Sequence, residues 1–93
     1  MRVRISSHTL QRADERGATE SEIREVLESG SPTSAKYGRL GKAKVFNYDA
    51  YRAGKWHSQK RVEVYFALEG DVISTITVYV FYGKWESADE NRV

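Results

Sequence analysis

The spacing of apolar and polar positions divides the chain into a helical beginning and an alternating remainder. Residues 7–17 and 19–30 carry apolar side chains three and four positions apart, the spacing of one helix face. After Pro32 apolar and polar residues alternate, which is typical of strands with one buried face. Short helices need a sheet to pack on. The pattern therefore predicts two N-terminal helices followed by a sheet.

Polar residues and glycines mark the ends of the predicted helices. Ser6 or Ser7 can accept a hydrogen bond from an early helical N–H and so cap the first helix. Gly17 can end that helix in the left-handed conformation. Thr19 and Glu22 have the spacing of a capping box, which predicts that the second helix begins at Thr19.

Alternating segments after the helices predict the strands. They are Ser34–Arg39, Ala43–Tyr48, Arg61–Leu68 and Val72–Tyr82. The polar residues 49–58 predict a long hairpin loop, and Arg2–Ile5 is either a short edge strand or an extended lead-in. The predicted fold class is α+β, with two N-terminal helices packed on one face of a roughly four-stranded antiparallel sheet.

The last two strands sort their side chains onto two faces. Beneath the helices we expect Val62, Val64, Phe66 and Leu68, together with Val72, Ile76, Val78 and Val80. The opposite face then carries Arg61, Glu63, Tyr65, Ala67, Thr75, Thr77, Tyr79 and Phe81. This second face is open, so it offers a surface for a ligand.

Length and composition bound the class of protein. The 93 residues are expected to form a single α+β domain over 1–85, with 86–93 as a polar C-terminal tail. The absence of cysteine and of a long apolar segment makes a cytoplasmic setting without membrane association the expectation. His8 and His57 lie near no cluster of further metal-binding residues, so neither a metal site nor a cofactor is expected.

Positive charge is concentrated in the middle third of the chain. The net charge is +2, but residues 31–61 carry eight basic residues and one acidic residue, which gives this segment +7. A polyanion such as RNA selects a basic segment of this kind. Alternatively, the lysines protect exposed sheet edges, as they do in many soluble proteins.

The first predicted helix presents His8, Arg12 and Arg16 on one face, four residues apart. An imidazole exchanges a proton near neutral pH, and guanidinium groups bind phosphate oxygens with paired donors. The three residues are therefore candidates for an acid–base group and a phosphate clamp. Alternatively, the face is solvated, and Glu15 pairs with Arg12 across one turn.

The open sheet face carries the residue types of a metal-independent ribonuclease site. Such a reaction requires a base for the ribose 2′-hydroxyl, a cation for the phosphorane and an acid for the leaving oxygen. Glu63 or His8 would supply the base, and Arg61 the cation. His8 or Tyr79 would supply the acid, on the same face as Thr77. Alternatively, these side chains form ordinary cross-strand pairs.

A second group of residues is expected to bind nucleic acid through charge and stacking. Trp56 and His57 can stack on an exposed base or fold back over the edge of the core. The complete set is Lys42, Lys44, Arg52, Lys55, Trp56, His57 and Lys60.

Two runs of sequence resemble a known family. They are Ile5-Ser6-x-His8-x-x-x-Arg12-x-x-x-Arg16-Gly17-x-Thr19-x-x-x-Ile23-x-x-Val26-Leu27-x-x-Gly30 and Gly70-Asp71-x-Ile73-x-Thr75-Ile76-Thr77-Val78-Tyr79. They resemble the beginning and the closing strand of a family of small bacterial domains of unknown function, whose members begin with an S-x-H-A-x-x-R-x-x-E-R-G helix. The middle of the chain resembles that family poorly.

The resemblance implies a fold similar to that of RelE-type and barnase-like ribonucleases, many of which are toxins. The marked positions of the family fall on His8, Arg12, Arg16 and Thr77. Thr9 replaces the usual alanine, and Lys60-Arg61 stands where members often have a second histidine. The second departure argues against a two-histidine mechanism and leaves His8, Glu63 and Tyr79 for two proton transfers.

These observations lead us to expect an RNA-directed domain, a metal-independent endoribonuclease of toxin lineage with an antitoxin or immunity protein as partner. The alternative is a non-catalytic module that binds RNA or protein, either antitoxin-like or a degenerate toxin fold, and the missing second histidine favours it. A dimerising structural protein is a third alternative, which would have a long unpaired apolar edge at Val72–Tyr82.

Overall fold

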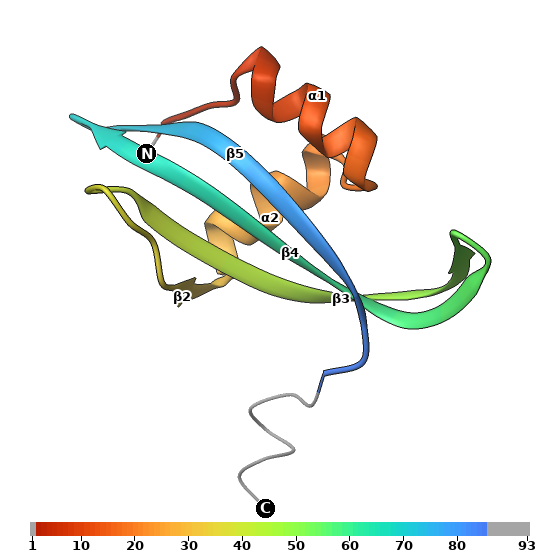
Figure 1. The fold of residues 1–93 in the computed structure, drawn as a ribbon. Helices are drawn as coiled ribbons and strands as arrows, with labels where there is room; N and C mark the ends of the chain where they lie inside the picture. Colours follow the sequence, from red (N-terminus) through yellow and green to blue (C-terminus); the bar gives the residue numbers. More distant parts are fainter. Residues whose placement is uncertain (1, 86–93) are drawn as a thin grey trace, which may run out of the picture.

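The computed structural model describes residues 2–85, which form two helices and a five-stranded mixed sheet (Figure 1). In chain order the elements are β1 (Arg2–Arg4), α1 (Ser7–Arg16), α2 (Glu20–Ser29), β2 (Ser31–Thr33), β3 (Leu40–Arg52), β4 (Lys55–Glu69) and β5 (Val72–Gly83). The α+β class, with both helices before most of the sheet, is confirmed. The polar tail predicted for residues 86–93 lies outside the described residues.

The sheet has the order β1-β5-β4-β3-β2 and differs from the predicted four antiparallel strands. β1 pairs with β5 in parallel over Val72–Ser74, whereas the other neighbouring strands are antiparallel. The strand predicted for Ser34–Arg39 is wrong, because Tyr37 and Gly38 have φ angles of 60° and 72°. This left-handed conformation interrupts an extended backbone.

The ends predicted for both helices are confirmed. Ser6 caps α1 by accepting a hydrogen bond from the Thr9 N–H at 3.1 Å, and Gly17 ends the helix with a φ of 93°. Thr19 and Glu22 form the reciprocal hydrogen bonds of the capping box at the start of α2. Local sequence therefore determines where both helices begin.

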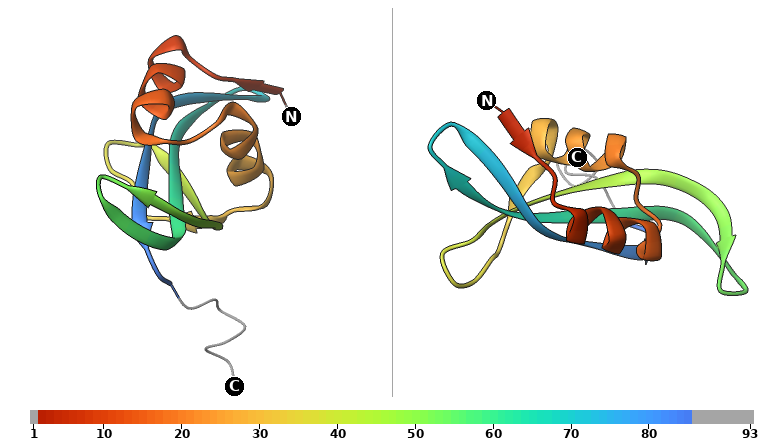
Figure 2. Two further views of the ribbon diagram at one scale, coloured as in Figure 1. Left: turned by 90° about the vertical axis from the view of Figure 1, so that its right-hand side faces the viewer. Right: turned by 90° about the horizontal axis from the view of Figure 1, so that it is seen from above.

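The helices cover one face of the sheet, with α1 beside β5 and α2 over β3 and β4 (Figure 2). The core between them is made of Ala13, Ala18, Ile23, Val26, Leu27, Val62, Val64, Phe66, Ile73 and Val78. Each fully buried side chain of valine or isoleucine contributes about 1.5–3 kcal/mol. No helix of residues 2–85 covers the face of β4 and β5 that is turned away from α1 and α2, and we call it the open face.

A β-bulge in β5 moves Thr75 to the helix side. Tyr65 and Phe66 of β4 are consecutive, but they pair with Thr77 and Thr75, so β5 contains one extra residue. Thr75 is 5 % exposed, and its hydroxyl donates to the Thr9 hydroxyl at 3.0 Å. The prediction that Thr75 lies on the open face is therefore wrong, because the extra residue reverses the alternation of side chains.

The segment predicted to be a long loop is the end of a long hairpin. β3 and β4 extend to a two-residue turn at Ala53 and Gly54, whose φ angles of 52° and 78° suit a tight hairpin turn. A second bulge lies between Asn47 and Ala50 of β3. The polar composition of this segment reflects the exposure of the hairpin end and not a lack of regular structure.

Candidate functional site

Three alternate side chains of β4 form a hydrogen-bonded cluster on the open face. Arg61 Nε donates to Glu63 Oε2 at 2.9 Å, and the Tyr65 hydroxyl donates to Glu63 Oε1 at 2.8 Å. The side chains of Arg61 and Glu63 are 31 % and 15 % exposed. A cation, a carboxylate and a phenol are thus held together at a partly shielded surface.

The neighbouring strand β5 adds a second column of side chains. Thr77, Tyr79 and Phe81 pair with Tyr65, Glu63 and Arg61, respectively. The rings of Tyr65 and Tyr79 meet edge to face, with centroids 5.8 Å apart. Together these six residues form what we call the open-face cluster.

Tyr65 is a fixed hydrogen-bond donor in this cluster. Burial, then the hydrogen bond to Glu63 and the charge of that carboxylate, raise the pKa of Tyr65 to about 12. The phenol therefore stays protonated at neutral pH. A Cβ atom added at Gly41 would lie 2.9 Å from the Tyr65 ring, so the ring packs directly on the backbone of β3.

Arg16 reaches the open face from α1. Its Nη1 donates to the carbonyl of Val78 in β5 at 2.7 Å, and its guanidinium carbon lies 4.7 Å from the centre of the Tyr79 ring. This route exists because β1 pairs with β5 only over Val72–Ser74, so α1 lies beside the remainder of that edge. Arg16 thus places a second guanidinium group next to the open-face cluster.

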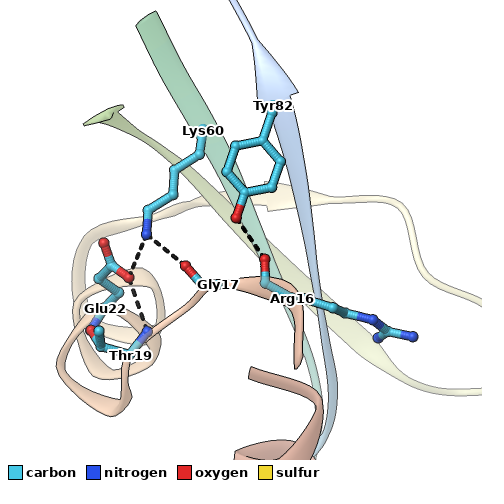
Figure 3. Close-up of polar contacts among 6 residues, drawn as sticks. All are labelled: Arg16, Gly17, Thr19, Glu22, Lys60 and Tyr82. Atoms are coloured by element: carbon cyan, nitrogen blue, oxygen red, sulfur yellow. Dashed lines mark hydrogen bonds and ion pairs between the residues drawn. The ribbon is translucent and has the colours of Figure 1, made fainter. Parts of the chain in front are cut away.

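Three strands hold the end of α1 that carries Arg16. Arg52 donates to the main-chain carbonyl of residue 15 at 3.0 Å. Tyr82 and Lys60 donate to the carbonyls of residues 16 and 17 at 2.6 and 2.8 Å (Figure 3). These carbonyls lack helical partners and carry the negative end of the helix dipole, so cations and a hydroxyl stabilise them. Figure 3 shows the Arg16 side chain directed away from Lys60 and past β5. The main chain of Arg16 is therefore fixed while its side chain reaches the open face.

The loop between β2 and β3 borders one end of the open face. Residues 34–37 and Arg39 line a cavity of about 260 Å³ together with Tyr65, Thr77 and Tyr79. Lys36 and Arg39 add two exposed cations there. Sequence reasoning placed Tyr65 on the open face without giving it a catalytic role, and it assigned neither Lys36 nor Arg39 to the site. The basic composition of the middle segment signalled the loop, but its position depends on the fold.

The other members of the predicted helical motif lie elsewhere on α1. His8 is exposed in the first turn, and Arg12 pairs with Glu15 at 2.7 Å along the helix. Within residues 2–85, no hydrogen bond or ion pair joins His8 or Arg12 to the open-face cluster. Of the predicted catalytic residues, the structure brings together Arg16, Arg61, Glu63, Thr77 and Tyr79.

Most of the basic residues predicted to bind nucleic acid connect the helices to the sheet. Lys42 and Lys44 bond to α2, and Arg52 bonds to the end of α1. Lys60 is 6 % exposed and bonds to the turn between the helices. These contacts give much of the positive charge of the middle segment a structural role.

The remaining predicted residues lie at the end of the long hairpin. Lys55, Trp56 and His57 line a shallow depression of about 290 Å³ with Ser58, Tyr82, Gly83 and Lys84. The ring of His57 lies 5.5 Å from that of Tyr82. The hairpin end is therefore a separate basic and aromatic surface.

Two further observations concern metals and membranes. Within the described residues, no group of three or more His, Asp and Glu side chains is arranged to hold a metal ion. Neither helix of this part of the chain has the length and apolar character needed to span a bilayer.

Comparison with known proteins gives one family match. Residues 5–80 match the family described as Domain of unknown function (DUF4258). Neither the curated proteins nor the solved structures contain a match to the chain. The matched segment includes both helices and the open-face cluster except Phe81. The chain therefore belongs to the family Domain of unknown function (DUF4258).

Proposed function

We propose that this chain acts on RNA and cleaves it at the open face without a metal ion. The observation that carries the proposal is that Arg16 from α1 lies over the ring of Tyr79, while Glu63, the cross-strand partner of Tyr79, is bonded to Arg61. Two guanidinium groups next to a carboxylate and a phenol provide the cations, the base and the acid that phosphodiester cleavage requires.

The proposed reaction is an internal transesterification. The ribose 2′-oxygen attacks phosphorus, the bond from phosphorus to the 5′-oxygen breaks, and a 2′,3′-cyclic phosphate forms. Glu63 accepts the proton of the 2′-hydroxyl, and Tyr79 donates a proton to the leaving 5′-oxygen. Arg16 and Arg61 stabilise the charge that develops on the phosphorane oxygens.

RNA binding rearranges one contact in this scheme. Arg61 exchanges Glu63 Oε2 for a phosphate oxygen, which frees that carboxylate oxygen for the 2′-hydroxyl. Tyr65 keeps its hydrogen bond to the other oxygen, Oε1, and so maintains the orientation of Glu63. Lys36 and Arg39 bind flanking phosphates at the border of the cavity.

We also propose that the chain shares its lineage with RelE-type and barnase-like ribonuclease toxins and has an antitoxin or immunity protein as partner. Support comes from the resemblance of the helix with His8, Arg12 and Arg16, and from the order of two helices before four strands, β2 to β5, that pair antiparallel. An inhibitory partner of this kind would cover the open face.

The test is incubation of the protein with RNA in the presence of EDTA. We expect cleavage products ending in a 2′,3′-cyclic phosphate, and at least about a hundredfold loss of rate in Glu63→Gln and Arg61→Ala. Arg24→Ala is the matched control, because Arg24 pairs with Glu20 on the exposed side of α2. An RNA with a 2′-deoxy sugar at the cleaved position should bind but remain intact. Absence of products from the wild-type protein would remove the catalytic proposal.

A non-catalytic RNA-binding module is the second candidate. It is favoured by the engagement of both Glu63 oxygens, one by Arg61 and one by Tyr65. This alternative predicts RNA binding that weakens steeply with salt and in Arg61→Ala, with no product at any time.

A further inference from the structure

Two aromatic rings stand side by side on β5 at the open face. Tyr79 and Phe81 are 42 % and 48 % exposed, and their ring centroids lie 6.5 Å apart with an angle of 21° between the planes. Exposed rings that are nearly parallel offer flat apolar surfaces to a planar partner. A phenylalanine that is half-exposed at one end of the open-face cluster is not explained by the packing of the core.

Cations accompany both rings. The Arg16 guanidinium lies over the ring of Tyr79, and Arg61 is the cross-strand partner of Phe81. The ligand that suits this surface therefore combines a planar aromatic group with a nearby negative charge. A nucleotide has both, with the base as the planar group and the phosphate as the charge.

We infer that Phe81, together with Tyr79, is a stacking platform for one unpaired nucleobase adjacent to the phosphate bound by Arg16 and Arg61. This inference rests on the proposed function and specifies its substrate. In a duplex both faces of a base are covered by its neighbours, so only a strand that is unpaired at this nucleotide can place a base on Phe81. The substrate class is therefore RNA that is single-stranded at the bound phosphate, with little preference for the identity of the base.

The experiment measures binding of fluorescently labelled RNA by anisotropy in EDTA, with Glu63→Gln in the background so that the RNA remains intact. The probes are a single-stranded octamer, the same octamer in a duplex, and a set of octamers that each carry one abasic site at a different position. We expect the duplex and one abasic octamer to bind at least about tenfold more weakly than the intact single strand.

Variants at position 81 separate stacking from a general loss of apolar surface. Phe81→Leu should weaken binding of the single strand by about tenfold, whereas Phe81→Trp should retain it. Leu68→Ala is the matched control, because Leu68 is an apolar residue that is 50 % exposed near the end of β4 and lies outside the open-face cluster. Circular dichroism of each variant establishes that the fold is intact.

The outcomes distinguish this inference from the proposed function. The stacking platform is refuted if Phe81→Leu binds the single strand as tightly as the protein with Phe81 does, and if the duplex binds as tightly as the single strand. RNA binding at the open face stands in that case, provided that Arg61→Ala still weakens binding. If the protein with Phe81 intact binds none of the probes, both fall. Equal weakening by every abasic position would also contradict a platform for a single base.

Discussion

Gly17 illustrates how closely single residues fit at the end of α1. A Cβ atom there would lie 2.2 Å from the Tyr82 hydroxyl and 3.0 Å from Arg52, and the φ of 93° is unfavourable for other residues. Those two side chains are the ones that bond to the last carbonyls of α1. A change at Gly17 therefore disturbs both the helix end and the position of Arg16.

Replacement of this glycine should cost more stability than replacement of a glycine in open space. We expect Gly17→Ala to lower the free energy of unfolding by more than ~2 kcal/mol, because steric overlap adds to backbone strain. Gly54→Ala is the control, since Gly54 also has a positive φ of 78° but nothing lies near its Cβ position. Urea unfolding measures both. Equal losses would show that only the backbone conformation matters.

The raised pKa of Tyr65 predicts a dependence of stability on pH. Between pH 10 and about 12 the folded protein keeps the Tyr65 proton that the unfolded chain loses. The stabilisation is therefore complete below pH 10 and decreases as the pH rises to about 12. The free energy of unfolding of Tyr65→Phe should therefore decline less steeply than that of wild type between pH 10 and about 12. Tyr51→Phe, which changes an exposed ring, is the control, and its free energy of unfolding should decline as that of wild type does.

Individual side chains show where sequence reasoning succeeded and where it stopped. Arg61, Glu63 and Tyr79 were placed on the open face by alternation alone, because β4 and β5 pair without a bulge there. Tyr65 was placed on the same face, but its role as a donor to Glu63 depends on a distance that alternation does not provide. Arg16 could be recognised as a candidate, whereas its path around the edge of β5 required the short length of β1.

At the scale of elements, the helices were predictable and the strands only partly so. Capping residues mark the helix ends within a few positions, so no tertiary information is needed. The bulges in β3 and β5 leave no comparable local signal, yet the one in β5 changes the face on which Thr75 lies. Pairing of β1 with β5 joins opposite ends of the chain and is invisible to local patterns.

The turn of the long hairpin carries a residue that does not suit it. Ala53 has a φ of 52° in a two-residue turn, where asparagine is preferred before glycine. Ala53→Asn should therefore raise the free energy of unfolding by about 0.5–1 kcal/mol. Ala53→Val should lower it, because β-branched residues disfavour a positive φ. Thermal unfolding checks the pair, and a destabilised Ala53→Asn variant would contradict the assignment of the turn.

For the molecule as a whole, Lys60 connects the two helices to the centre of the sheet. Its ammonium group, with the side chain 8 % exposed, bonds to the Gly17 carbonyl and to Glu22 at 2.9 Å (Figure 3). Glu22 also completes the capping box of α2. One buried cation therefore sets the position of α1, of α2 and of the turn between them.

Replacing one partner of this ion pair should destabilise the fold more than the loss of the pair as a whole would suggest, because the other charge is then left buried and unpaired. Glu22→Gln leaves a buried ammonium without its carboxylate, and we expect a loss of about 3 kcal/mol. The double variant Lys60→Met, Glu22→Gln should lose less than the sum of the single variants, because no unpaired charge remains. Urea unfolding of the three variants gives the coupling energy. Strict additivity would show that the pair does not act as a unit.

The hydrogen bond from Arg16 to Val78 matters beyond the proposed chemistry, because it occupies a carbonyl of β5 at an edge of the sheet where β1 no longer pairs. An unoccupied strand border is a template on which another polypeptide can add a strand. The same side chain that reaches the open face therefore also discourages self-assembly. Loss of this arginine would allow β5 to pair edge to edge with β5 of a second molecule. Arg16 variants should therefore elute as larger species in size-exclusion chromatography as their concentration rises.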